Sequence, residues 1–221
     1  MCIRDRLQRL ETVRRDFIAN VSHELKTPIT SIKGSVETLL QEEEMDGSTL
    51  NRFLKIIARH SDRLNSIIED LLTLSRIEQG QFAGVEHLQE TSINQLVQQV
   101  LQVCEHGASE KGIKLQMNGD EKLDAAVNPP LLEQALINLV ENAIKYSDPK
   151  SLVSLSLEKQ ADKFNIGVKD RGFGIEAKHH ERIFERFYRV DVARSRKLGG
   201  TGLGLSIVKH IIQAHQGTIS L

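Results

Sequence analysis

The chain has 221 residues, enough for one or two domains, and 39% of them are hydrophobic and 27% charged. The formal net charge is −1, without the basic excess typical of general nucleic-acid binders, so we expect no nucleic acid partner. The two cysteines, Cys2 and Cys104, form no metal-binding or disulfide pattern, which indicates a reducing compartment. Because no run of about 18 apolar residues occurs, we expect no membrane contact by this segment.

The first 80 residues predict two long helices. Apolar residues recur every three or four positions from about residue 5 to residue 40, which is typical of one helix face. The polar stretch QEEEMDGST interrupts this pattern, and we expect Ser48 or Thr49 to cap a second helix whose near-heptad stripe reaches Leu74. Because an αα-hairpin buries little by itself, we expect two copies to form a dimeric four-helix bundle.

The remaining residues predict an α+β domain. Helices are expected at Ile93 to His106, PPLLEQALINLVENAIKYS and TGLGLSIVKHIIQAHQ, and strands at IKLQM, LVSLSLEK, KFNIGVKD and the terminal GTISL. This order favours an α/β sandwich with helices over one face of a sheet. We therefore predict a helical hairpin over residues 1–82 and a sandwich domain over residues 83–221, truncated at its C-terminal end.

One histidine in the first helix stands out. At about 100° per residue, His23 lies roughly 200° from the apolar residues two positions away on either side, so it should face solvent. Glu24 is its neighbour, Thr27 shares its face, and Pro28 should bend the helix just after it. One interpretation is an exposed histidine in a kinked helix. The other is a nucleophilic imidazole whose neighbouring carboxylate orients the ring or takes its proton.

Three segments of the second domain have the chemistry of a nucleotide site. In NLVENAIKYS, Asn142 could offer an amide oxygen to Mg²⁺, and Lys145 could reach a phosphate. In DRGFGI, Asp170 could accept a hydrogen bond from an amine such as that of adenine, and the glycines allow close backbone approach. In GGTGLGLSIV, glycines lead into a helix start that favours phosphate, without the P-loop or dinucleotide spacing. Each segment alone is also explained by an ordinary helix or turn. The three segments together, in this order, indicate a nucleotide site much more strongly.

Between the second and third of these segments lies ERIFERFYRVDVARSRKLGG. Its Phe184, Phe187 and Tyr188 could anchor a mobile lid to the core, and its basic residues could approach phosphates.

Taken together, the chain resembles the transmitter core of two-component sensor histidine kinases. SHELKTPIT matches the phospho-acceptor box of that family, NLVENAIKYS the N box, DRGFGI the G1 box, ERIFERFYRVD the F box and GGTGLGLSIV the G2 box. Within the family, RRDFIANVSHELKTPITSIKGSVETLL and DRLNSIIEDLLTLSRIE resemble the phosphate-regulon sensor kinases most. The resemblance implies a phosphotransfer hairpin joined to an ATP-binding domain of the Hsp90, gyrase and histidine-kinase type.

By position, the resemblance also implies the residue roles. His23 would be phosphorylated by Mg-ATP and would pass the group to an aspartate of a response regulator, with Glu24 assisting and Thr27 serving a phosphatase reaction. Mg²⁺ would bind at Asn142. The other residues implied to contact the nucleotide are Asn138, Lys145, Tyr146, Asp170, Gly172, Gly174, Gly200, Thr201, Gly202, Leu203 and Gly204. The segment would be the cytoplasmic portion of a protein anchored in the membrane further upstream.

Four alternative functions compete with this one. In related ATPases the residue four before the Mg-binding asparagine is a water-activating glutamate, but here it is Asn138, which argues against ATP hydrolysis to water. A non-catalytic dimerisation scaffold would be expected to have lost residues of the nucleotide-binding motifs, and these motifs are intact. A phosphatase-dominant sensor stays open because Glu24 and Thr27 are both present. The motifs of a serine/threonine kinase are missing. The other histidines, including His60 on the second helix, are interpreted as surface or packing residues.

Overall fold

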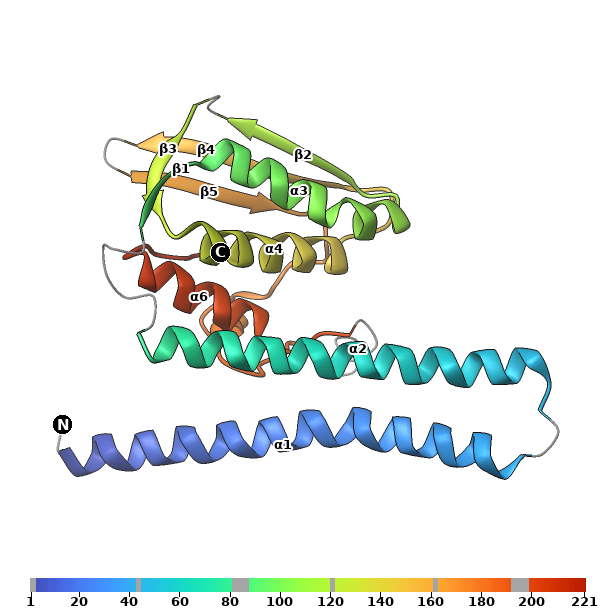
Figure 1. Ribbon diagram of the computed structural model, residues 1–221. Coiled ribbons are helices and arrows are strands. Elements are labelled where there is room, and N and C mark those ends of the chain that lie inside the picture. The colour runs from blue at the N-terminus through green and yellow to red at the C-terminus, as the bar shows by residue number, and fades with distance from the viewer. Residues whose placement is uncertain (1–2, 43–44, 81–87, 120–121, 161–162, 192–198) are drawn as a thin grey trace. The chain divides into compact units, whose positions relative to one another are not determined.

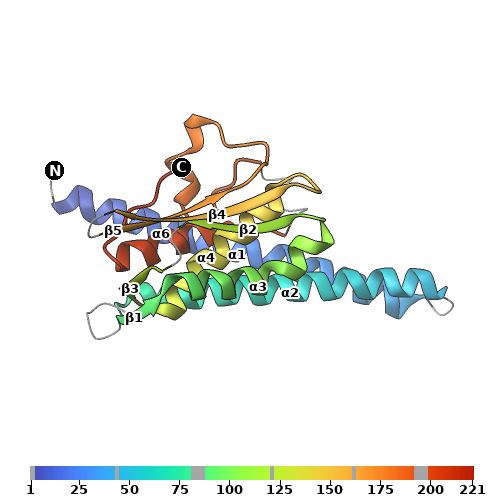
Figure 2. The same cartoon turned by 90° about the horizontal axis from the view of Figure 1, so that it is seen from above.

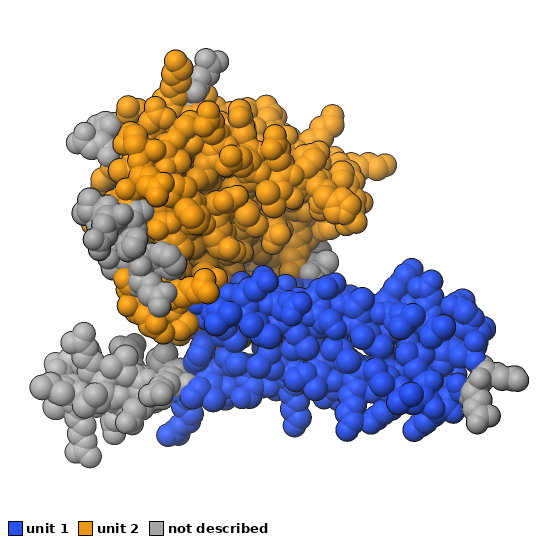
Figure 3. Space-filling view, viewed as in Figure 1, with its two compact units in different colours: residues 1–72, 195–201 blue, residues 73–194, 202–221 orange. Residues whose placement is uncertain are grey.

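The computed structural model describes residues 3–42, 45–80, 88–119, 122–160, 163–191 and 199–221. The chain forms two compact units (Figure 3). The helical unit comprises residues 1–72 and 195–201, and the α/β unit comprises residues 73–194 and 202–221. The boundary expected after residue 82 falls among residues 81–87, outside the described part, and stays a prediction.

The helical unit is built on two long helices, α1 (Ile3–Gln41) and the larger part of α2 (Gly47–Glu78), which run side by side in opposite directions (Figure 1). The expected cap at Ser48 or Thr49 is wrong, because Asp46 is the capping residue. Asp46 Oδ1 accepts hydrogen bonds from the backbone N–H groups of Ser48 at 2.8 Å and Thr49 at 2.9 Å. Hydrogen bonds from the Ser48 and Thr49 hydroxyls hold the pKa of Asp46 well below its usual range.

Helix α1 continues without interruption through Pro28. The bend expected there stays a prediction. Pro28 is buried, as are Glu24 and Ser35, and these three positions share one helix face. The apolar residues Ile29 and Val36 lie on a different face and are 54% and 38% exposed. One hairpin therefore covers only part of the apolar surface that the sequence pattern identifies.

The α/β unit contains a three-stranded sheet in the order β2-β4-β5 and a separate antiparallel pair, β1-β3. Strand β2 is parallel to β4, and β4 is antiparallel to β5. The strands are β1 (Gln89–Ser92), β2 (Lys114–Gly119), β3 (Asp124–Val127), β4 (Leu152–Gln160) and β5 (Lys163–Lys169). The helices are α3 (Ile93–Glu110), α4 (Pro129–Tyr146) and α6 (Gly204–Ala214), with short 3₁₀ turns η2 (Ala177–His179) and η3 (Arg182–Phe184).

Helices α3 and α4 cover one face of the sheet, and α6 packs on α4 (Figure 2). Val153, Leu155 and Leu157 alternate along β4 and are buried in the core that this face forms. The predicted α/β sandwich is therefore confirmed. The β1-β3 pair was not predicted, because both strands are only four residues long. The strand expected at GTISL is wrong, since residues 217–221 have no regular secondary structure.

A short series of hydrogen bonds connects the start of helix α4 with the end of helix α6. Asn128 caps α4, accepting from the N–H of Leu131 at 3.2 Å, and its own N–H donates to His215 Nε2 at 2.9 Å. His215 Nδ1 donates to the carbonyl of Ile211 at 2.8 Å, so both bonds are made by the neutral ring. The end of α6 is thus fastened to the start of α4.

Candidate phosphotransfer and nucleotide sites

The predicted acceptor, His23, is exposed on helix α1, as the helical geometry indicated. It borders a shallow groove of about 370 Å³ that Lys26, Thr27, Thr30 and Ser31 also line. Thr27 Oγ1 donates to the carbonyl oxygen of His23 at 3.2 Å, so this hydroxyl is turned toward its own helix. The imidazole is therefore accessible, and the residues that line the groove beside it are all of polar or charged types.

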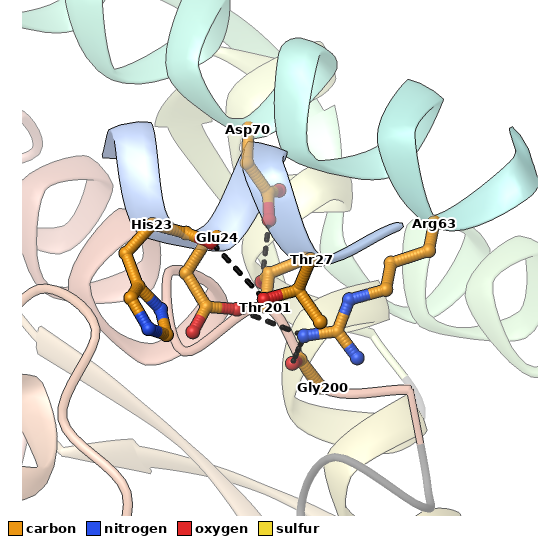
Figure 4. A network of polar contacts seen from close by, with 7 residues as sticks. All are labelled: His23, Glu24, Thr27, Arg63, Asp70, Gly200 and Thr201. Atoms are coloured by element: carbon orange, nitrogen blue, oxygen red, sulfur yellow. Dashed lines mark hydrogen bonds and ion pairs between the residues drawn. The ribbon is translucent and has the colours of Figure 1, made fainter. Parts of the chain in front are cut away.

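Glu24, next to the histidine, is buried, and its carboxylate contacts Arg63 of helix α2 (Figure 4). The residue is 9% exposed, and its Oε2 accepts from Arg63 Nη2 at 2.8 Å. The same Nη2 lies 3.3 Å from the carbonyl oxygen of Gly200. Sequence reasoning missed Arg63, which precedes Leu64 of the apolar stripe of α2 and has no motif to distinguish it.

On α4, the two asparagines of the N box occupy partly buried positions. Asn138 lies against the first turn of α6, because a Cβ built on Gly204 would be 3.7 Å from its side-chain oxygen. Its Nδ2 is buried and has no hydrogen-bond partner among the described residues. Such an atom is costly to leave unsatisfied, so it marks a place where a ligand atom would be stabilised.

The G1 segment is fastened to the C-terminal end of α4. Gly172 forms a β-bridge with Ser147, and its N–H donates to Asp170 Oδ1 at 2.7 Å. A Cβ at Gly172 would lie 2.5 Å from the carbonyl oxygen of Tyr146, so only glycine fits. The rings of Tyr146 and Phe173 meet edge to face at 5.9 Å, and Lys145 Nζ is 5.9 Å from the Tyr146 ring centre. Asp170, Lys145 and Tyr146 are thus brought to one region of the α/β unit.

The glycine-rich segment contacts the F box through Gly202. Phe187 donates its N–H to the carbonyl of Gly202 at 2.8 Å, and a Cβ on Gly202 (φ 79°) would lie 2.9 Å from Phe187 Cα. Leu203 is fully buried, and α6 begins at Gly204. Gly200 and Thr201, in contrast, belong to the helical unit, so the predicted G2 residues are divided between the two units. The basic residues expected at positions 192–198 lie outside the described part of the chain.

The residues of the α/β unit fit a nucleotide. The buried, unpartnered Nδ2 of Asn138 is suited to donate to a phosphate oxygen, and Gly172 and Gly202 allow the segments on either side of the site to pack closely on Tyr146 and Phe187. Within the described ranges, no group of three histidine, cysteine, aspartate or glutamate residues could hold a metal ion. Mg²⁺ commonly binds through one or two protein oxygens, substrate phosphate oxygens and water, so Asn142 could hold it together with a bound nucleotide.

None of the helices that the structure describes is both long and apolar enough to cross a membrane.

Comparison with known proteins supports the same assignment. The model of the His Kinase A (phospho-acceptor) domain matches residues 13–80, and that of the histidine kinase-, DNA gyrase B- and HSP90-like ATPase matches residues 127–221. The sensor-like histidine kinase SenX3 of Mycobacterium tuberculosis is 39% identical over 211 residues, covering 96% of this chain and 51% of the relative. The sensor protein kinase WalK of Staphylococcus saprophyticus is 35% identical over 214 residues, covering 96% of this chain and 35% of the relative.

Two solved structures have a similar fold. The histidine kinase ThkA in complex with the response regulator protein TrrA aligns with a TM-score of 0.75 at 26% identity, over 97% of this chain and 58% of that chain. The histidine kinase AdeS of Acinetobacter baumannii aligns with a TM-score of 0.66 at 26% identity, over 87% of this chain and 86% of that chain. The chain therefore belongs to the sensor histidine kinases and carries the phospho-acceptor and ATP-binding domains of that family.

Proposed function

We propose that this chain phosphorylates itself on His23 with ATP and then transfers the phosphoryl group to an aspartate of a response regulator receiver domain. The observation that carries the proposal is the exposed imidazole of His23, beside a shallow groove, in a chain that also has a nucleotide-type site. A ring nitrogen would attack the γ-phosphorus, and the bond to the β–γ bridging oxygen would break, releasing ADP. The regulator carboxylate would then attack the same phosphorus, with the imidazole as leaving group.

Phosphoryl transfer depends mainly on positioning and charge neutralisation, and the residues of the α/β unit are suited to both. Asp170 would accept from the adenine amine, beside the ring of Tyr146. Lys145 would neutralise phosphate charge, and the Asn138 and Asn142 amides would orient the phosphates. Mg²⁺, when bound, would offset the charge that develops on the transferred group. The backbone N–H groups of the glycine-rich segment would complete the phosphate contacts.

Hydrolysis of ATP to water is the less suitable reaction. Asn138 lacks a basic side chain at the position where ATPases of this fold carry glutamate. Glu141 is three residues further along α4, on an exposed part of the helix, and so does not replace it. Without a base to activate water, the γ-phosphoryl group is retained for His23.

A second activity, removal of phosphate from the regulator, is compatible with Thr27 beside the groove. Its hydroxyl would have to turn away from the carbonyl of His23 to orient a water molecule. We include this activity in the proposal because Glu24 and Thr27 keep the spacing that the family uses for it.

A second copy of the chain is proposed as the partner of the helical unit. Large apolar side chains are exposed along both helices: Ile18 57%, Ile29 54%, Leu40 80%, Leu50 42%, Leu54 51%, Ile68 46% and Leu72 52%. Spacings of 4, 11 and 14 residues place them on one face of each helix, which a four-helix bundle would bury. Light scattering should give twice the chain mass, and a charged residue at Ile29 should reduce it to that of the monomer.

The remaining parts of the proposal depend on the family resemblance alone. These are a role in the response to phosphate starvation and a cytoplasmic location next to an upstream membrane anchor.

The test is transfer of radiolabel from γ-labelled Mg-ATP to the purified chain. The wild type should acquire an acid-labile, base-stable label, and His23→Gln should acquire none. His106→Gln is the matched control, because His106 is also a strongly exposed helical histidine, and it should be labelled normally. Steady release of inorganic phosphate without labelled protein would favour the ATPase instead.

A further inference from the structure

Two side chains of helix α2 hold the Gly200–Thr201 part of the glycine-rich segment (Figure 4). Thr201 Oγ1 donates to Asp70 Oδ2 at 2.7 Å, and Arg63 Nη2 donates to the carbonyl oxygen of Gly200 at 3.3 Å. Arg63 and Asp70 are seven residues apart, so they lie on nearly the same face of α2. Two neighbouring residues of the segment are therefore bound by one helix face.

The guanidinium of Arg63 also connects this segment to the acceptor box. Its Nη2 contacts both Glu24 Oε2 and the Gly200 carbonyl, and the side chains of Arg63 and Glu24 are only 13% and 11% exposed. Charge-assisted hydrogen bonds of this kind are shorter and stronger than neutral ones. The guanidinium that contacts the glycine-rich segment is thus itself held in place by its ion pair with Glu24.

The contact with Asp70 is incompatible with phosphate at the same place. The Thr201 hydroxyl donates to a carboxylate, and a nucleotide phosphate near Gly200 and Thr201 would face that negative charge. The carboxylate and a phosphate would compete for the same hydroxyl. Nucleotide binding that uses Thr201 therefore requires the segment to leave Asp70.

We propose that Arg63 and Asp70 are positioning residues that retain the glycine-rich segment on helix α2 and so lower the affinity of the chain for nucleotide. This inference rests on the proposed function, since it concerns the same nucleotide site. Only molecules in which the segment is released from α2 can bind nucleotide with full affinity. The apparent dissociation constant therefore equals the intrinsic one divided by the fraction of such molecules.

The first test is the affinity for ADP, measured by calorimetry on the whole chain. Asp70→Ala should tighten binding by about tenfold, the factor expected for losing one hydrogen bond to a charged group. Asp70→Asn keeps an acceptor oxygen without the charge and should give a smaller gain. Asp62→Ala is the matched control, because Asp62 is an exposed aspartate of the same helix, and it should leave affinity unchanged. In autophosphorylation, Asp70→Ala should lower the KM for ATP and leave kcat nearly unchanged.

The second test does not depend on nucleotide affinity. With Cys2→Ser as background, the pair Asp70→Cys and Thr201→Cys should form a disulfide under mild oxidation, whereas Asp62→Cys with Thr201→Cys should not. ADP should slow the cross-link, and the cross-linked protein should bind ADP about tenfold more weakly than the same protein after reduction.

Two results would overturn the inference. One is unchanged or weaker ADP binding by Asp70→Ala, and the other is failure of the variant with both Asp70→Cys and Thr201→Cys to cross-link. A chain that cross-links as expected but binds no nucleotide in any variant would refute the proposed function while leaving the contact itself established.

Discussion

Removal of the Arg63 guanidinium should strongly destabilise the helical unit. The Arg63 and Glu24 side chains are 13% and 11% exposed, and the distance from Nη2 to Oε2 is 2.8 Å. Removing one partner of a buried ion pair typically costs about 3–5 kcal/mol, because a charge stays buried without its counter-ion. Since each side chain keeps about a tenth of its exposure, we expect Arg63→Ala to lower the free energy of unfolding by about 2–4 kcal/mol.

A double-mutant cycle separates this pair from other effects of the substitution. Arg63→Met and Glu24→Gln should each destabilise the unit, and the double variant should lose less than the sum of the two. Urea unfolding followed by helical circular dichroism is a suitable assay, at one fixed protein concentration because dimerisation contributes to stability. Arg59→Ala is the control, since Arg59 is exposed one turn earlier on α2. If Arg63→Ala differed from Arg59→Ala by less than about 0.5 kcal/mol, the surface limit, the ion pair would not contribute as argued.

Three further predictions concern single side chains. Lys111 Nζ donates to the carbonyls of Ile144 at 2.9 Å and Lys145 at 2.7 Å, at the end of α4, so Lys111→Met should lower the free energy of unfolding by about 1–2 kcal/mol. The control Lys114→Met, at an exposed position, should change it very little. Equal melting temperatures of the two variants would contradict the prediction. The lowered pKa of Asp46 means that its stabilising effect is fully present above pH of about 3.9 and is lost as pH falls further. The difference in stability between the wild type and Asp46→Ala should therefore shrink below that pH in acid titrations, and a constant difference would refute the capping role. Burial and, to a lesser extent, the charge of Glu141 raise the pKa of Cys104 to about 11. At pH 8 the thiol of the folded protein should therefore react with Ellman's reagent about a hundredfold more slowly than that of the protein unfolded in urea. Equal rates, measured in a Cys2→Ser background, would show that the thiol is not buried.

The sequence was sufficient for features that local periodicity encodes. The two long helices, the outward position of His23 and the sandwich of the second domain follow from spacing and alternation, and all three are present in the structure. Local patterns did not reveal Asp46 as the α2 cap, because Ser48 and Thr49, two and three positions after it, are also favoured capping residues.

The contacts between residues far apart in the chain could not be predicted. Glu24 and Arg63 are 39 positions apart, and Thr201 and Asp70 are 131 apart. Nothing in the composition near either residue indicates its partner, because such pairing depends on how the helices and the glycine-rich segment meet. The division of the G2 residues between two units was missed for the same reason.

The hydrogen bond between His215 and Asn128 restricts how helix α6 can tilt. It fastens the far end of α6, whereas the near end, at Gly204, borders Asn138. Eleven residues at 1.5 Å each give an arm of about 16 Å, so a tilt of about 5° around His215 would move Gly204 by more than about 1 Å. A displacement of that size is enough to change the rate of a reaction that depends on alignment. Together with the buried residues of α6, we expect the His215–Asn128 bond to limit such a displacement and so to help align Gly204 with Asn138.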